Sequence, residues 1–286
     1  MSEQAFRKGY SLVVREGDDL ERLLPAIAAA GFEGIEPTFV TGAIPSPEEP
    51  TSGARQLRDV CDRLGLSIPS MRAGRIPWTT IPSNHARDRS AALDHIRKAF
   101  ESLQIMGGTV LLVVPGDRIP EVDYHTHWRR VVEFGRAAGE IAAEFDMRIG
   151  LENVEARFPV SEIDWRSLID EIASDSVGVY LDVGNVRWLG FGFPDQWIRT
   201  LGSRIVQVHF KDATYRLAGG TLHAEVRQLL EGDVDWPAVM RALNETGYRG
   251  WISVEPEAYR FMPERLPMRL SVDLDALFKL NSGGPG

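Results

Sequence analysis

Short apolar runs alternate with amphipathic segments along the whole of this 286-residue chain. Eight runs of strand length are each followed by a segment with helical spacing or helix-end signals. Alternating strands and helices predict βαβ units, in which the strands lie parallel. Eight such units in fewer than 300 residues fit a closed barrel better than an open sheet. We therefore expect an α/β protein with a single (β/α)8 TIM barrel.

The predicted strands are rich in apolar and β-branched residues, as TVLLVV at 109–114 shows. Continuous runs of this kind are typical of strands buried on both faces. The expected strands are 10–14, a short run ending near 36, 66–71, 109–114, 147–152, 177–182, 205–210 and 251–255. The expected helices are 18–30, 53–64, 84–106, 124–146, 164–173, 194–201, 236–246 and 273–280. We expect one domain over 1–280 and a flexible tail at 281–286.

Composition excludes several classes of function. Lys and Arg number 32 against 41 Asp and Glu, which gives a net charge of −9. A nucleic-acid binder needs a positive surface, so we expect no nucleic-acid partner. No apolar run approaches the roughly 20 residues that cross a membrane, so we expect no membrane partner. The single cysteine, Cys61, cannot form an internal disulfide, and a cytoplasmic location is the expectation.

Polar side chains stand where four consecutive strands of the predicted barrel end. Strand five ends in Glu152, strand six in Asp182, strand seven in His209 and strand eight in Glu255. The C-terminal ends of barrel strands meet at one rim, where the chemistry of such folds occurs. Any one of these residues could be a helix cap or a solvated loop residue. Three carboxylates crowded after apolar strands, however, would repel one another without a cation.

This set of ligands indicates a divalent metal site. Carboxylate oxygens with one imidazole favour Mn²⁺ or Mg²⁺, and Co²⁺ or Zn²⁺ could also bind. We therefore predict one divalent metal, with Mn²⁺ preferred. His125 and His127, near the start of a predicted helix, are interpreted as solvated loop residues away from the catalytic rim.

The second half of the chain resembles the sugar-phosphate isomerase/epimerase family of xylose isomerase-like barrels. The resemblance is greatest to the L-ribulose-5-phosphate 3-epimerases and the ketose 3-epimerases. It rests on four segments: IGLENV at 149–154, YLDVGNVRWLG at 180–190, VQVHFKDA at 206–213 and EGDVDWPAVMRALNETGYRGWISVE at 231–255. It implies that Glu152, Asp182, His209 and Glu255 bind the metal, and that Asn185 and Lys211 contact the substrate.

The implied reaction moves a proton next to the carbonyl of a ketose or ketose phosphate, through a metal-stabilised enediolate. Epimerisation needs a base on one face of a carbon and an acid on the other. Glu152 and Glu255 come from non-adjacent strands and could flank the substrate as the catalytic pair. Arg72, Lys211 and Arg216 could bind a phosphate or orient hydroxyls, although a surface ion pair is as good an interpretation of each arginine.

Several alternatives stay open at this point. Trp188 could cover the apolar face of a sugar or pack in the core. The segment 228–232 reads QLLEG where the family usually has P-x-G-E-G, so a metal-dependent lyase such as an inosose dehydratase or a sugar β-eliminase is an alternative. A non-catalytic sugar-binding barrel is disfavoured because all four ligand positions are filled. Family members usually associate, so we expect a homodimer or a homotetramer.

Overall fold

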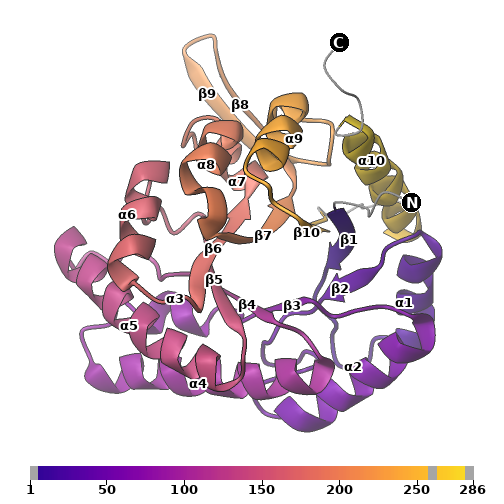
Figure 1. Cartoon of the computed structure of the whole chain (residues 1–286), viewed down its shortest axis with the longest axis horizontal. Coiled ribbons are helices and arrows are strands. Elements are labelled where there is room, and N and C mark those ends of the chain that lie inside the picture. Colours follow the sequence, from indigo (N-terminus) through magenta and orange to yellow (C-terminus); the bar gives the residue numbers. More distant parts are fainter. Residues whose placement is uncertain (1–5, 257–262, 281–286) are drawn as a thin grey trace.

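Eight strands form one sheet in this computed structural model, which describes residues 6–256 and 263–280. The sheet order is β2-β1-β10-β7-β6-β5-β4-β3, and every neighbouring pair runs parallel. Hydrogen bonds from Ile35 N to the Ser67 carbonyl (2.9 Å) and from Phe39 N to the Arg72 carbonyl (2.8 Å) join the two ends of the sheet. Helices surround the strands (Figure 1), and the predicted (β/α)8 barrel is confirmed.

Most elements lie close to their predicted positions. The strands are β1 (Phe6–Ser11), β2 (Gly34–Glu36), β3 (Ser70–Arg72), β4 (Val110–Val113), β5 (Arg148–Glu152), β6 (Val177–Asp182), β7 (Ile205–Phe210), β8 (Asp212–Ala218), β9 (Thr221–Arg227) and β10 (Gly250–Val254). The helices are α1 (Leu20–Ala29), α2 (Pro50–Leu64), α3 (Ile76–Thr80), α4 (Ala86–Met106), α5 (Tyr124–Glu144), α6 (Glu162–Ile172), α7 (Val183–Trp188), α8 (Pro194–Leu201), α9 (Trp236–Glu245) and α10 (Leu266–Leu280). The predicted tail at 281–286 lies outside the described residues. Among the helices of the described ranges, none combines the length and apolarity needed to span a membrane.

The first strand begins four residues earlier than predicted, because β1 tolerates two charged residues and a glycine. Lys8 is only 7% exposed, yet its ammonium reaches Asp275 of α10 at 2.9 Å. Gly9 lies against Ser253 of β10, where a Cβ would stand 2.4 Å from the serine Oγ. The segment FRKG can form a strand despite its two charges. The long side chain of Lys8 extends to a carboxylate, and Gly9 permits the neighbouring strand to approach closely.

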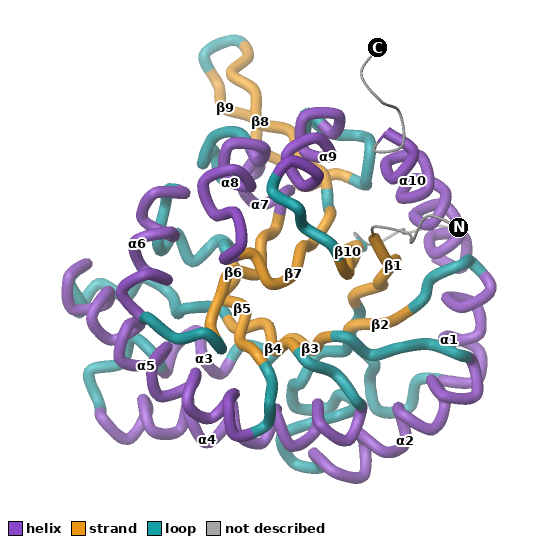
Figure 2. The backbone as a smooth tube through the Cα atoms, in the orientation of Figure 1, coloured by secondary structure: helices purple, strands orange, loops and turns teal. Residues whose placement is uncertain are grey.

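A two-stranded antiparallel hairpin, β8–β9, occupies the region that was expected to be a long loop after strand seven. Gly219 and Gly220 both adopt positive φ, as a tight hairpin turn requires. Apolar residues alternate along both strands and pair across them, as in Leu217 opposite Leu222. The hairpin extends outward from the barrel (Figure 2), and this alternation around Gly-Gly is the sequence signal of a hairpin that the prediction missed.

His127 is buried, which contradicts its interpretation as a solvated residue. It lies in the first turn of α5, and its ring stacks on Phe158 with centroids 4.0 Å apart. Its Nε2 lies 3.2 Å from the carbonyl oxygen of Pro115, just after β4. A helix that follows a parallel strand starts at the C-terminal end of that strand, so the assignment to the opposite side of the barrel was also wrong.

Burial lowers the pKa of His127 from 6.5 to about 4, and this predicts a pH-dependent stability. As the pH falls, the unfolded chain therefore binds a proton at His127 before the folded chain does. The stabilising contribution is therefore complete above about pH 6.5 and is lost as the pH falls towards 4. Between pH 7 and pH 5 the loss should be about 2 kcal/mol. Between pH 7 and pH 5, the free energy of unfolding of His127→Phe, measured by urea denaturation, should fall by about 2 kcal/mol less than that of the wild-type protein.

His125→Phe is the matched control, because His125 is exposed and lies only two residues away. It should keep the pH dependence of the wild-type protein. An unchanged dependence in His127→Phe would show that His127 carries its proton in the folded state.

Candidate metal centre

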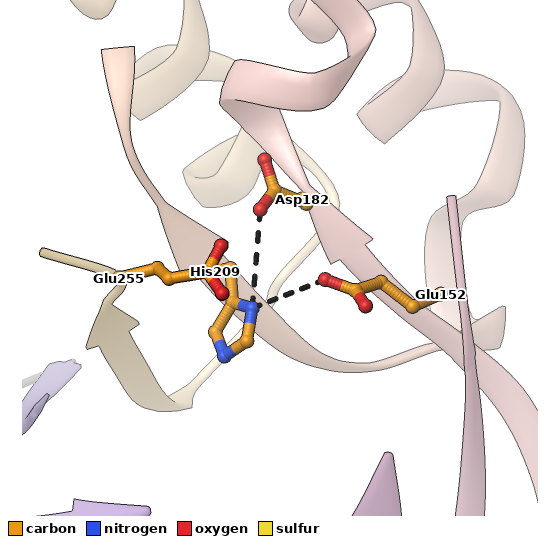
Figure 3. A group of neighbouring side chains, drawn as sticks. All are labelled: Glu152, Asp182, His209 and Glu255. Atoms are coloured by element: carbon orange, nitrogen blue, oxygen red, sulfur yellow. Dashed lines mark hydrogen bonds and ion pairs between the residues drawn. The ribbon is translucent and has the colours of Figure 1, made fainter. Parts of the chain in front are cut away.

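Four predicted ligands converge at one end of the barrel. Glu152 ends β5, Asp182 ends β6, His209 lies near the end of β7, and Glu255 follows β10. One ligand atom from each residue lies within 4.8 Å of all the others. The first three side chains are buried, and Glu255 is 24% exposed. Figure 3 shows Glu152 and Glu255 reaching towards His209 from opposite sides, with Asp182 on a third side.

Asp182 uses its two carboxylate oxygens for different purposes. Its Oδ1 accepts a hydrogen bond from the backbone N–H of Asn185 at 2.7 Å and thereby caps the short helix α7. Its Oδ2 is buried with no hydrogen-bond partner among the described residues, although the Lys211 ammonium lies 3.2 Å away. A buried carboxylate oxygen left without a donor is costly, so Oδ2 is an available ligand for a cation.

Two asparagines fix Asp182 relative to the neighbouring strand. Asn153, directly after β5, accepts a hydrogen bond from Asp182 N at 2.8 Å and donates one to the Asp182 carbonyl at 2.9 Å. The amide of Asn185 donates to the Asn153 carbonyl at 2.9 Å. Its Oδ1 must therefore point the other way, and it is buried with no partner among the described residues.

The HFKD segment at 209–212, which begins inside β7, combines a cation for the cluster with a structural carboxylate. Asp212 accepts hydrogen bonds from Val234 N at 3.2 Å and Trp236 Nε1 at 2.9 Å, which join it to the start of α9. A Cβ on Gly232 would lie 2.0 Å from Asp212 Oδ1, and one on Gly184 would lie 2.3 Å from Lys211 Cγ. Both glycines are therefore needed so that backbone can pack closely around this segment.

Two cations partly offset the carboxylate cluster. Lys211 lies 2.6 Å from Glu255 Oε2, and Arg72 lies 2.7 Å from Glu255 Oε1. Burial alone would raise the pKa of Glu255, but Lys211, His209 and Arg72 together lower it well below its usual range. Burial also opposes the charge of Lys211, yet the carboxylates of Asp182 and Glu255 raise its pKa above its usual value.

The pKa values of Glu152 and Asp182 are shifted in the opposite direction from that of Glu255. Burial raises the pKa of Glu152 to about 7; His209 opposes this shift, and the neighbouring carboxylates add to it. Burial is also the main cause that raises the pKa of Asp182. The chain alone therefore leaves part of the negative charge of this cluster without compensation.

His209 lies among three carboxylates. Its Nδ1 is 3.3 Å from Glu152 Oε1 and 3.9 Å from Asp182 Oδ2, on the side of the cluster. Its Nε2 is 2.7 Å from Oε1 of Glu36, at the end of β2. Glu36 is fully buried, and although burial opposes this, His209 and Arg72 lower its pKa to about 2.

The donor set fits a divalent metal ion. Three carboxylates and one imidazole approach a common point, one carboxylate oxygen lacks a hydrogen bond, and the two nearby cations bind the outer carboxylate. Oxygen-rich ligation with one histidine suits Mn²⁺, Mg²⁺ and related ions.

Most of the residues predicted to bind substrate border one cleft of about 960 Å³ that reaches the cluster. Arg72, Asn185, Trp188 and Lys211 line it together with Glu152 and Glu255. Arg216 does not line it; it projects from the hairpin, and its guanidinium pairs with Asp233 at 2.6 Å. The cleft also contains Arg75 and Trp78, whose side chains stack at 4.7 Å and were not predicted.

Sequence reasoning also missed Glu36 and Asn153 as parts of this site. Glu36 ends a short strand in GIEP, and its position at a strand end is the same signal that identified the four ligands. Asn153 directly follows Glu152, and its role became visible only from its hydrogen bonds to the backbone of the next strand.

Comparison with known proteins agrees with this geometry. The family model described as "Xylose isomerase-like TIM barrel" matches residues 24–275, well over half of the chain. The chain belongs to the xylose isomerase-like TIM barrel family. This confirms the family resemblance found in the sequence, including its similarity to ketose epimerases.

Curated relatives of this xylose isomerase-like barrel have different names. An uncharacterised protein of Methanocaldococcus jannaschii is 28% identical over 62% of this chain and 61% of its own length. A 3-dehydroshikimate dehydratase of Pseudomonas putida is 27% identical over 86% of this chain and 38% of its own length. A protein of Escherichia coli with the provisional name L-ribulose-5-phosphate 3-epimerase is 25% identical over 67% of this chain and 66% of its own length. The chain thus spans less than two thirds of the length of each relative.

Solved structures share the complete barrel at low sequence identity. A D-allulose 3-epimerase of Methylomonas sp., crystallised with D-allulose, superposes with a TM-score of 0.75 at 17% identity and covers 98% of each chain. An L-ribulose 3-epimerase superposes with a TM-score of 0.75 at 18% identity, covering 96% of this chain and 94% of its own. At this identity the likeness establishes the fold.

Proposed function

We propose that this chain is a divalent-metal-dependent epimerase or isomerase that acts on a ketose or ketose phosphate through an enediolate. The main support is the placement of Glu152 and Glu255 on opposite sides of one cluster that Asp182 and His209 complete (Figure 3). Two carboxyl groups that face a substrate from opposite sides are what inversion at carbon requires. The family membership and the names of the relatives agree with this reaction class.

Glu152, Asp182, His209 and Glu255 would hold the ion, with Mn²⁺ as the proposed metal. When bound, such an ion would act as a Lewis acid on the carbonyl oxygen of the substrate. Asp182 and His209 are proposed only to bind it. One carboxylate oxygen of Asp182 is already used to cap α7, and the ring of His209 lies between the carboxylates of Glu36 and Glu152.

The two glutamates are proposed to move the proton. Both side chains border the cleft and reach the cluster from opposite sides (Figure 3), so each could contact a substrate bound there. Glu255 would take a proton from one face of the carbon, and Glu152 would return one on the other face. Their roles exchange in the reverse reaction.

The remaining cleft residues are proposed to recognise hydroxyl or phosphate groups. Within the described part of the chain, Asn185 Oδ1 is a buried acceptor without a hydrogen-bond partner, so it suits a substrate hydroxyl. Arg72 and Lys211 each donate to Glu255 and also border the cleft. Trp188 offers an aromatic wall for the apolar face of a sugar. The placement of Arg216 favours an ion pair on the hairpin instead of substrate contact.

A metal-dependent dehydratase is the second candidate. It is favoured by the relative whose name is 3-dehydroshikimate dehydratase and which matches 86% of this chain. Removal of a proton next to a carbonyl is common to both reactions, and they diverge when a β-hydroxyl leaves. Small-molecule substrates, a homodimer or homotetramer and a cytoplasmic location remain proposals alongside either activity.

The proposed function predicts solvent exchange at a carbon next to the carbonyl. Mn²⁺-loaded protein incubated in D₂O with a panel of ketoses and ketose phosphates should incorporate deuterium there, because the proton lost to a glutamate exchanges with solvent. NMR of the products distinguishes inversion, movement of the carbonyl and loss of water. Loss of water would replace the proposal by the dehydratase, and absence of exchange with every ketose tested would overturn it.

The metal centre predicts that Asp182→Ala and His209→Ala lose tight Mn²⁺ binding in titration calorimetry, because each removes one ligand. Chelation of the wild-type protein should lower its melting temperature. An ion at a thousand times its Kd stabilises a fold by about 4 kcal/mol, or about 7 °C for a chain of this size. Glu155→Gln, which removes an exposed cleft carboxylate outside the cluster, should bind Mn²⁺ normally. Stoichiometric metal in both alanine variants would refute the site.

Glu152→Gln and Glu255→Gln test proton transfer apart from ligation, because glutamine keeps the size and one acceptor oxygen. Mn²⁺ affinity should fall modestly, whereas turnover should fall about 10²- to 10⁴-fold. One variant should still exchange the substrate proton with D₂O without inversion, because removal and return on one face need a single base. Glu140→Gln, at an exposed position of α5 outside the cleft, is the control for turnover. Full activity in either glutamine variant with metal bound would assign the proton transfer to another residue.

A further inference from the structure

Glu36 lies below the cluster, inside the barrel, and it is contacted by residues from four other strands. It is fully buried. Its Oε1 lies 2.8 Å from Ser11 Oγ and 2.7 Å from His209 Nε2. Its Oε2 accepts hydrogen bonds from Ser70 Oγ at 2.6 Å and from the hydroxyl of Tyr180.

The surrounding hydroxyls show that Glu36 is an acceptor only. Ser70 Oγ itself accepts from Gln207 Nε2 at 2.7 Å, so its single proton is directed at Glu36. Ser11 and Tyr180 each direct their one hydroxyl proton at Glu36 as well. A carboxyl group with three hydroxyl donors and an imidazole around its two oxygens has no place for a proton of its own.

This acceptor determines which nitrogen of His209 carries a proton. Because Glu36 can only accept, Nε2 must donate to it. The opposite nitrogen, Nδ1, faces Glu152 and Asp182 at 3.3 and 3.9 Å. An imidazole binds a metal through the nitrogen that lacks a proton, and the partner of the other nitrogen sets the tautomer.

We propose that Glu36 is a positioning residue that keeps a proton on His209 Nε2 and thereby presents Nδ1 to the metal ion. This role rests on the proposed metal centre. It also extends the site into the barrel interior, because the ligand on β7 is oriented by a carboxylate on β2, on the other side of β1 and β10 in the sheet.

A purely structural role for Glu36 makes a different prediction. Its hydrogen bonds connect β1, β2, β3, β6 and β7, so removing it would also lower stability. Ser70→Ala is the matched control, because it removes a hydrogen bond to Glu36 Oε2 and leaves the contact between Glu36 and His209 in place. A structural role predicts similar effects of Glu36→Leu and Ser70→Ala on metal binding once both are folded.

The experiment combines titration with Mn²⁺ and nitrogen NMR of the Zn²⁺-loaded protein labelled with [¹⁵N]histidine. The chain has six histidines, and His209→Gln assigns the signal. In the wild-type protein we expect a one-bond proton coupling at Nε2 and none at Nδ1. Glu36→Leu, which leaves no acceptor for Nε2, should lose the fixed proton there and bind Mn²⁺ about 10- to 100-fold more weakly. Ser70→Ala should keep both the coupling and the affinity.

The outcomes separate this proposal from the one on which it rests. Failure of the wild-type protein to bind Mn²⁺ would overturn the metal centre and, with it, this role of Glu36. Normal Mn²⁺ binding by Glu36→Leu with Nε2 still protonated would overturn the role of Glu36 alone. Should Glu36→Leu fail to fold, the wild-type spectrum decides: a proton on Nδ1 and none on Nε2 refutes the proposal.

Discussion

The repulsion among three carboxylates that share one small volume is the constraint on which the rest of this site depends. Glu152, Asp182 and Glu255 place ligand oxygens within 4.8 Å of one another and of His209. Leaving such charges buried and uncompensated would cost several kcal/mol each. Lys211 and Arg72 relieve part of this repulsion, and both act on Glu255, at the more exposed side of the cluster. The inner carboxylates, Glu152 and Asp182, are left with raised pKa values, which is the electrostatic environment that a divalent ion would relieve.

Holding these charges in place requires a rigid support, and the chain builds it from short-range motifs. Asn153 binds the backbone of Asp182 on both sides, so the ends of β5 and β6 keep a fixed register. Asp212 performs the corresponding task between β7 and α9. Gly184 and Gly232 allow the close approaches that these contacts need. The family motifs in this sequence therefore contain residues that position the candidate ligands as well as the ligands themselves. Asn153 and Asp212 are such positioning residues.

The fold and the four candidate ligands were accessible from the sequence because both follow from local rules. Alternating strands and helices predict a parallel barrel, and the C-terminal ends of its strands must meet at one rim. Contacts across the barrel interior have no such local signature. Glu36 stands 173 residues before His209, and nothing in either neighbourhood indicates that they touch. The position of Arg216 could not be predicted for a related reason. Its strand, β8, belongs to a hairpin that extends away from the barrel, and its side chain pairs with Asp233 there. His127 was misplaced because an exposed turn and the buried first turn of a helix look alike in sequence.

The two halves of the barrel contribute different residues to the cleft, and the proposed function would give them different tasks. All four candidate ligands come from β5, β6, β7 and the residue after β10, where the motifs of the family are clearest. The opposite wall of the cleft comes from the first half of the chain, through residues such as Thr38, Arg75 and Trp78. Under the proposed function, proton removal next to a carbonyl would depend on the first group, whereas recognition of the sugar and the choice between epimerisation and dehydration would depend on the second. Both outcomes are represented among the names of the relatives, one a dehydratase and one an epimerase. The residues that distinguish these outcomes should be sought on β1 to β4 and their loops, with the chemistry of the metal cluster held constant.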